Sequence, residues 1–73
     1  MKEAKKKSIL KEIGIKISKR RLKMNKSQQD VSTKTGLARN AISAIENGHR
    51  DVRYTSLFKL AKVLNCKVRD FVD

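Results

Sequence analysis

The 73-residue sequence contains no proline, no tryptophan, three glycines and a single cysteine, Cys66. A lone cysteine cannot form an intramolecular disulfide or supply a zinc-binding cluster, so we expect no metal site. We expect Cys66 itself to be a small buried hydrophobic residue. No apolar run approaches the roughly 18 residues that a membrane span requires, and nothing resembles a secretory signal. These absences predict a soluble protein of the reducing cytoplasm, without a membrane partner.

Acidic residues are also scarce, since seven Asp and Glu stand against 19 Lys and Arg and leave a net charge of +12. Residues 1–26 carry most of the excess, with eleven basic and two acidic residues. A basic field of this density favours a polyanionic partner, with nucleic acid ahead of anionic lipid. Aromatic residues are few, one Tyr and two Phe, which argues against a protein that stacks single-stranded bases.

The lack of proline and of alternating apolar and polar residues favours an all-α fold. Apolar residues recur at three- to four-residue spacing from Leu10 and predict a helix over residues 10–23. Gly14 weakens this helix and indicates a close contact with another one. The basic residues 1–8 form either a flexible arm or an extension of that helix, and residues 9–73 are predicted to form one domain.

Four further helices are expected, over residues 28–35, 39–47, 55–64 and 68–72. Ser27, with Asp30 three residues later, is typical of a capping box at a helix start. Gly36 supplies a tight turn, and the Asn47–Gly48 pair ends the following helix. Ile42 and Ile45 are predicted to hold that helix to the core.

Two short helices joined by a turn at Gly36 make a helix-turn-helix unit. Because its isoleucines face inward, the second helix presents Arg39, Asn40 and Ser43 outward in its N-terminal half. In the major groove Arg suits guanine, Asn suits adenine and Ser pairs with either base. These three residues are therefore the predicted base readers.

The chain, from about residue 13 to residue 72, resembles the Cro/repressor-type (XRE-type) helix-turn-helix family. The resemblance rests on Ser27-Gln28, Gly36, Ile42, the IENG of residues 45–48 and the LFKLAKVLNCKVRDF of residues 57–71. It implies a five-helix, lambda-repressor-like DNA-binding domain that reads bases with Arg39, Asn40 and Ser43, with Ala44 as a near neighbour. Ala38 departs from the family's usual Ser or Thr cap, but its methyl group suits contact with a thymine methyl.

The resemblance also implies residues that position the protein. Phosphate contacts are expected from the start of the second helix and from the segment after the third, namely from Ser27, Gln28, Asn47, Gly48, Arg50 and Arg53. The resemblance implies that Gln28 also supports the start of the third helix. An ion pair between Arg21 and Glu46 is expected to join the first helix to the third. We expect this pair to be partly buried, so that losing one partner costs more than at a surface pair.

The expected function is a sequence-specific, double-stranded DNA-binding transcriptional regulator that acts by operator occupancy. One helix-turn-helix reads few base pairs, so a homodimer on a pseudo-palindromic site is expected. The predicted dimer surface consists of Val52, Tyr54, Phe58, Val63 and Phe71.

No nucleophile–base pair, paired carboxylates or phosphate-cradling glycine loop is present, so we expect no catalysis, no cofactor and no small-molecule ligand. The alternatives are a protein-interaction module of the antitoxin type and a non-specific basic binder of nucleic acid or membrane. Among DNA regulators, the sequence leaves open a phage-type repressor, a restriction-modification controller and a mobile-element regulator.

Overall fold

The computed structural model describes the backbone of residues 2–72 and the side chains of residues 8–72. Within this range the chain forms five helices, α1 (Lys2–Lys23), α2 (Gln28–Thr35), α3 (Arg39–Glu46), α4 (Tyr54–Val63) and α5 (Arg69–Val72). No strand occurs among the described residues. The predicted all-α, five-helix class is confirmed.

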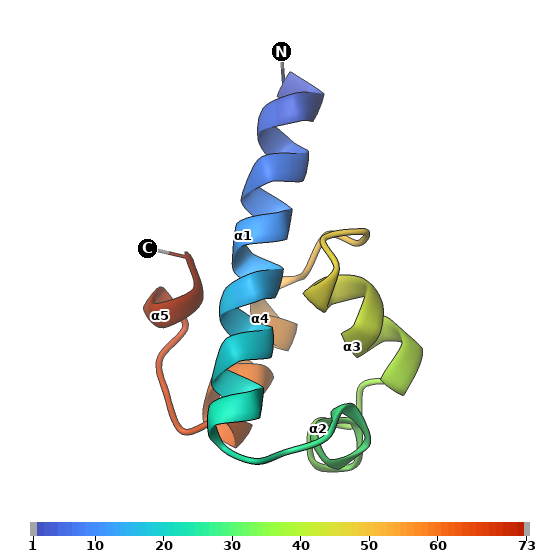
Figure 1. Ribbon diagram of the computed structural model, residues 1–73, viewed down its shortest axis with the longest axis vertical. Coiled ribbons are helices and arrows are strands. Elements are labelled where there is room, and N and C mark those ends of the chain that lie inside the picture. Colours follow the sequence, from blue (N-terminus) through green and yellow to red (C-terminus); the bar gives the residue numbers. More distant parts are fainter. Residues whose placement is uncertain (1, 73) are drawn as a thin grey trace.

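Helix α1 forms the long axis of the molecule (Figure 1). Helices α2 and α3 lie to one side of it, α5 lies to the other, and α4 runs behind it in this view. The helix begins at Lys2, so the backbone of residues 2–8 is helical and the first turns of α1 extend beyond the other elements (Figure 1). Because α1 contacts both α3 and α5, it positions the two outer faces of the molecule.

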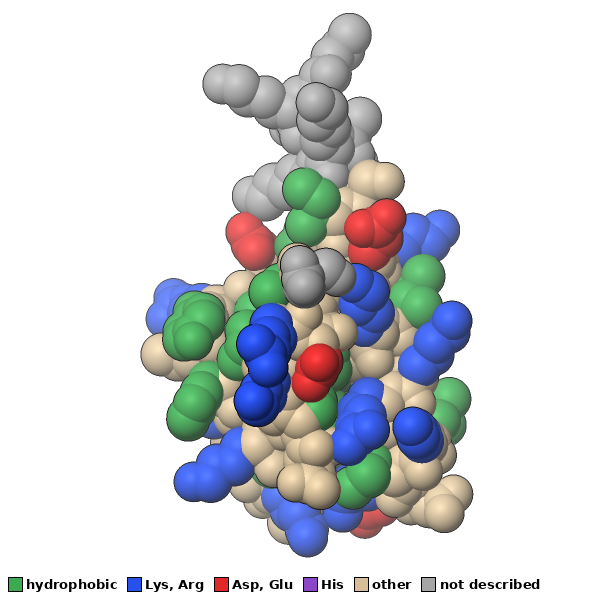
Figure 2. Space-filling view, turned by 90° about the vertical axis from the view of Figure 1, so that its left-hand side faces the viewer, with side chains coloured by type: hydrophobic (Ala, Val, Ile, Leu, Met, Phe, Trp, Pro, Cys, Tyr) green, Lys and Arg blue, Asp and Glu red, His purple; other side chains and the backbone are tan. Residues whose placement is uncertain are grey.

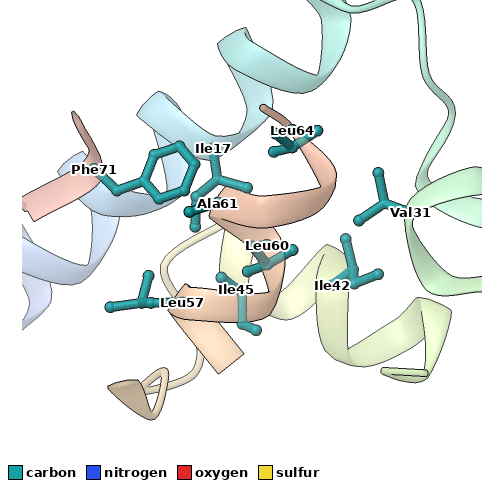
Figure 3. Close-up of a cluster of buried hydrophobic side chains, with 9 residues drawn as sticks. All are labelled: Ile17, Val31, Ile42, Ile45, Leu57, Leu60, Ala61, Leu64 and Phe71. Carbon is teal, nitrogen blue, oxygen red and sulfur yellow. The ribbon is translucent and has the colours of Figure 1, made fainter. Parts of the chain in front are cut away.

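Nine buried apolar side chains, drawn from all five helices and the residue that follows α4, make up the core (Figure 3). They are Ile17, Val31, Ile42, Ile45, Leu57, Leu60, Ala61, Leu64 and Phe71. The two isoleucines of α3 are 1% and 5% exposed, as predicted for residues that hold this helix inward. Burial of each such side chain contributes about 1.5–3 kcal/mol.

Phe71 requires a correction. The sequence placed its ring on a dimer surface, but the side chain is only 2% exposed and packs beside Ile17 and Ala61 in the core (Figure 3). A short final helix with one large aromatic residue buries that residue because little else in the helix anchors it to the bundle. Phe71 is therefore a core residue.

The ends of α2 follow the predicted signals. The Ser27 hydroxyl oxygen accepts the N–H of Asp30 at 3.0 Å, and an Asp30 carboxylate oxygen accepts the N–H of Ser27 at 2.9 Å. This capping box is confirmed, and its hydrogen bonds lower the pKa of Asp30 below the ordinary value. Gly36 ends the helix at a φ of 79°, a left-handed conformation that costs glycine little.

The starts of α3 and α4 lack such caps. Ala38 occupies the N-cap position of α3 with an extended backbone and makes no side-chain capping bond. Arg53 occupies the N-cap position of α4 and likewise makes no side-chain capping bond. Helix α4 begins at Tyr54, one residue earlier than predicted. The exposed N–H groups at the start of α3 therefore have no side-chain acceptor from Ala38.

Gly14 lies where α1 crosses the C-terminal end of α3. A Cβ atom at this position would lie 2.5 Å from the carbonyl oxygen of Glu46 and closer still to that of Ile45. Both neighbours are helix backbone, which cannot move aside as a flexible side chain does. The predicted close contact with another helix is confirmed, and glycine is what allows it.

We predict that Gly14→Ala destabilises the protein by roughly 1–3 kcal/mol, because the added methyl overpacks against rigid backbone. This loss should appear although alanine favours a helix by about 1 kcal/mol over glycine. Urea unfolding measures the change, with the exposed Ser8→Ala in the same helix as control. Equal stability of Gly14→Ala and the native protein would contradict the close contact.

We predict that Ala38→Ser stabilises the protein by about 1 kcal/mol, since a serine hydroxyl supplies the missing cap. Ser27→Ala is the matched variant, because it removes a cap that is present and should cost a similar amount. Thermal unfolding of both proteins gives the comparison. A lowered midpoint for Ala38→Ser would show that the start of α3 does not accept a cap.

Candidate nucleic-acid interface

The outward face of α3 brings the three predicted base readers together. Arg39 and Asn40 are exposed in the first turn, and Ser43 follows one turn later, partly buried. With Gln28 and Gln29 of α2 they line a shallow hollow on the surface. Because α3 is held from behind by its buried isoleucines, Arg39 and Asn40 face the solvent.

The two alanines of the predicted set flank this hollow differently. Ala38 is exposed immediately before α3, whereas Ala44 is partly buried on the far side of Ser43. The Ala44 carbonyl oxygen accepts the N–H of His49 at 2.9 Å and so helps to end the helix. Ala38 is consequently the more accessible of the two methyl groups.

Gln29 is a residue of this surface that the sequence reasoning missed. It is exposed in the first turn of α2, and it lines the same hollow as Arg39 and Asn40. Its amide nitrogen lies 3.4 Å from the Thr33 hydroxyl, which is a weak hydrogen bond. The available signal was its position beside Gln28 at the start of a capped helix.

A buried polar network lies directly behind α3. Arg21 Nε donates to Glu46 Oε2 at 2.7 Å, and Arg21 Nη2 donates to Glu46 Oε1 at 3.0 Å. Gln28 Nε2 donates to the same Oε1 at 3.0 Å, and Arg21 Nη1 donates to the carbonyl oxygen of Lys26 at 2.8 Å. The network joins α1, the α1–α2 connection, the start of α2 and the end of α3.

The expected ion pair between Arg21 and Glu46 is thus present, and it is strongly shielded. The side chains are 11% and 5% exposed, and bidentate geometry makes such a pair stronger than a single contact. Hydrogen bonding to Glu46 raises the pKa of Arg21, against the opposing effect of burial. The pair fixes where α3 lies on α1.

The resemblance implied that Gln28 supports the third helix, and it does so through Glu46, the last residue of α3. Its amide group donates to the buried carboxylate of Glu46, so the side chain connects α2 to α3. Ser27, beside it, uses its hydroxyl oxygen as the acceptor of the capping box. Both residues therefore have structural roles at the start of α2, whatever they contact outside the protein.

The segment after α3 needs a second correction. The backbone N–H groups of Asn47 and Gly48 donate to the carbonyl oxygens of Ser43 and Ile45, at 3.0 and 3.1 Å. These groups complete the end of the helix and are not free to hold phosphate. Gly48, at a φ of 71°, also lies against the backbone of Lys11 in α1.

The two arginines of this segment stay candidates for phosphate contact. Arg50 and Arg53 are both exposed, on the connection between α3 and α4. This connection continues from the C-terminal end of the helix that carries the base readers (Figure 1). Two exposed guanidinium groups beside α3 are suited to contact phosphate.

The predicted dimer residues divide by exposure. Tyr54 and Phe58 are 69% and 56% exposed and lie one turn apart on α4, beside a hollow shared with Val68. Val52 and Val63 are partly buried, and Val52 packs against the core. Two large apolar side chains thus remain on the surface of α4.

Arg20 makes contacts that the sequence did not indicate. Its Nε donates to the carbonyl oxygen of Leu64 and its Nη2 to that of Asn65, both at 2.8 Å. These bonds satisfy carbonyl groups at the end of α4, which a helix leaves without partners. They attach the α4–α5 connection to α1.

Cys66 packs against the core but is partly exposed, whereas the sequence predicted a buried residue. Burial raises the pKa of its thiol, which keeps it protonated and poorly reactive. Among residues 8–72, no group of three or more His, Cys, Asp or Glu is arranged to hold a metal ion. Over the same part of the chain, no helix has the length and apolarity needed to cross a bilayer.

Residues 17–71 match the helix-turn-helix family in sequence. The fold is similar to the crystal structure of the restriction-modification controller protein C.AhdI from Aeromonas hydrophila, with 27% identity and a TM-score of 0.82. That similarity covers 85% of this chain and 94% of the other. No curated protein shows significant similarity. The chain belongs to the XRE-type helix-turn-helix family of DNA-binding transcription regulators.

Proposed function

We propose that the protein binds a specific double-stranded DNA site as a homodimer and regulates transcription by occupying that site. The observation that supports this most strongly is the outward face of α3, where Arg39, Asn40 and Ser43 line one hollow. The ion pair between Arg21 and Glu46 holds this helix in place from behind. A polar helix face with fixed orientation fits the major groove, where base pairs differ in their donors and acceptors.

Each side chain of this face has a role that suits its chemistry. Arg39 pairs with guanine O6 and N7, Asn40 with adenine N6 and N7, and Ser43 with either kind of base. Ala38 and Ala44 offer methyl groups for thymine, the first more readily because it is exposed. These residues specify sequence.

A second set of residues positions the protein on the duplex. The N-terminus of α2, at Ser27 and Gln28, has the polarity that favours a phosphate group. Arg50 and Arg53, which follow the other end of α3, would contact the phosphate backbone of the DNA. Such contacts fix orientation without reading bases, and the bond from Gln28 to Glu46 links them to α3.

The dimer is proposed to form through α4. Tyr54 and Phe58 are exposed on this helix, and Val52 and Val63 are partly buried. Burial of two aromatic side chains contributes substantially to an interface. The two-fold symmetry would match an inverted repeat, with half-sites about one helical turn apart.

We further propose a role as the controller of a restriction-modification system, in preference to a phage-type repressor or a mobile-element regulator. The similarity to C.AhdI, itself a restriction-modification controller protein, supports this choice. It extends over most of both chains, so it includes the elements before and after the helix-turn-helix as well.

The test is a selection of bound duplexes from a random DNA pool at about physiological salt, followed by sequencing. We expect enrichment of an inverted repeat. Binding that declines steeply with salt, without any enriched sequence, would contradict specific recognition and indicate that the net charge of +12 alone attracts DNA.

We predict that Asn40→Ala lowers affinity for the selected duplex by roughly 1–3 kcal/mol and relaxes the preferred base at one position. Arg50→Ala is the control, because a phosphate contact should weaken binding to selected and random duplexes alike. Titration of both variants with both duplexes separates the two effects. Equal losses on the two duplexes for Asn40→Ala would rule out base reading by this residue.

A further inference from the structure

A groove with a high density of positive charge lies between α1 and α5, on the side of α1 away from α3 (Figure 1). Six basic residues line it, four from α1, one from the α4–α5 connection and one from the start of α5: Lys16, Lys19, Arg20, Lys23, Lys67 and Arg69. We call this surface the α1–α5 groove. None of these residues belongs to the proposed base-reading or phosphate-binding sets, whereas Lys67 and Arg69 also line the hollow beside Tyr54 and Phe58.

Almost all the charged residues that line the α1–α5 groove are positive. Asp70 is the one acidic residue among those that line it, and its carboxylate accepts the backbone N–H of Lys67 at 2.8 Å. Seen from the side that carries α5, the surface shows many blue Lys and Arg side chains and few red acidic ones (Figure 2). A concave surface lined by one sign of charge concentrates the field and attracts the opposite charge.

We propose that the α1–α5 groove is a second DNA-binding site, which holds the phosphate backbone of a duplex other than the one that α3 contacts. The groove and the α3 face lie on opposite sides of α1 (Figure 1). One protein molecule can therefore contact two duplexes at once. The groove binds through charge whether or not α3 reads a sequence.

The dimensions and side chains of the groove fit a duplex backbone. Lys16 and Lys23 lie about 10 Å apart along the helix axis, a length over which one DNA strand presents about three phosphates. Lys67 and Arg69 provide charge from the opposite side of the groove. Lysines act as flexible point charges, which suits phosphate contacts without sequence preference.

Other polyanions fit this groove less well. Single-stranded nucleic acid is bound by stacking bases on aromatic rings, and the one aromatic ring here, that of Phe71, is 2% exposed. An acidic protein segment normally needs an apolar anchor in a pocket, and the residues that line this groove include no exposed large apolar side chain. A regularly charged duplex needs neither feature.

The experiment is a two-duplex capture assay. The selected inverted-repeat duplex is fixed to beads and saturated with protein, so that the α3 faces are occupied. A fluorescent 30-base-pair duplex of scrambled sequence is then added at about 100 mM salt, and the captured fluorescence is measured for each amount of bound protein. Native protein should capture the second duplex, and capture should decline as salt rises.

The test variant is Lys19→Gln/Lys67→Gln, which removes one charge from each side of the groove. The control, Lys34→Gln/Lys59→Gln, makes the same change in charge at residues outside it, and all four lysines are exposed, so folding should be retained. We expect the groove variant to lower capture at least about fivefold with little change in the amount of protein on the beads. The control should capture nearly as well as the native protein.

Equal capture by both variants and the native protein, or an equal loss in both variants, would overturn the proposal. The proposal would also be overturned if native protein captured no second duplex but bound labelled polyglutamate, because the groove would then accept acidic polypeptide. Protein bound to the beads reports on α3 separately, so a failure of operator binding is distinguishable from a failure of the groove.

Discussion

The position of α3 depends on one buried interaction, the carboxylate of Glu46 held by Arg21 and Gln28. These three residues come from three helices and meet within 2.7–3.0 Å. A buried charge that loses its partner costs about 3–5 kcal/mol, so each partner strongly favours the arrangement in which all three meet. The network thereby converts a short, uncapped helix into a rigid support for its outward side chains.

Helix α1 provides the frame for that interaction and for the opposite side of the molecule. Gly14 lets α3 approach so closely that its carbonyl groups touch α1, and Arg21 completes the attachment. On the other side, Arg20 holds the carbonyl groups after α4 and so places the connection into α5. Adjacent arginines thus fix two different faces, one suited to reading bases and the other to binding phosphate by charge.

Local signals predicted much of this fold, and long-range contacts account for what they missed. The capping box at Ser27, the turn at Gly36 and the inward isoleucines of α3 depend on neighbours in sequence or on helical periodicity. The bonds from Arg20 to Leu64 and Asn65 span 44 and 45 residues, so no local pattern indicates them. Phe71 was misplaced for the same reason, because its burial depends on where α5 meets α1. The face of α3 and a supporting role for Gln28 were predictable, whereas the bond from Gln28 to Glu46 was not.

The most direct test of the central claim is a crystal structure of the protein with a duplex that it selects. We predict that the N-terminal half of α3 lies in the major groove, with the Asn40 amide within hydrogen-bonding distance of a base edge. The contacts among Arg21, Gln28 and Glu46 should be unchanged from those described here. A complex in which α3 lies outside the groove, or in which Glu46 has separated from Arg21, would contradict the account.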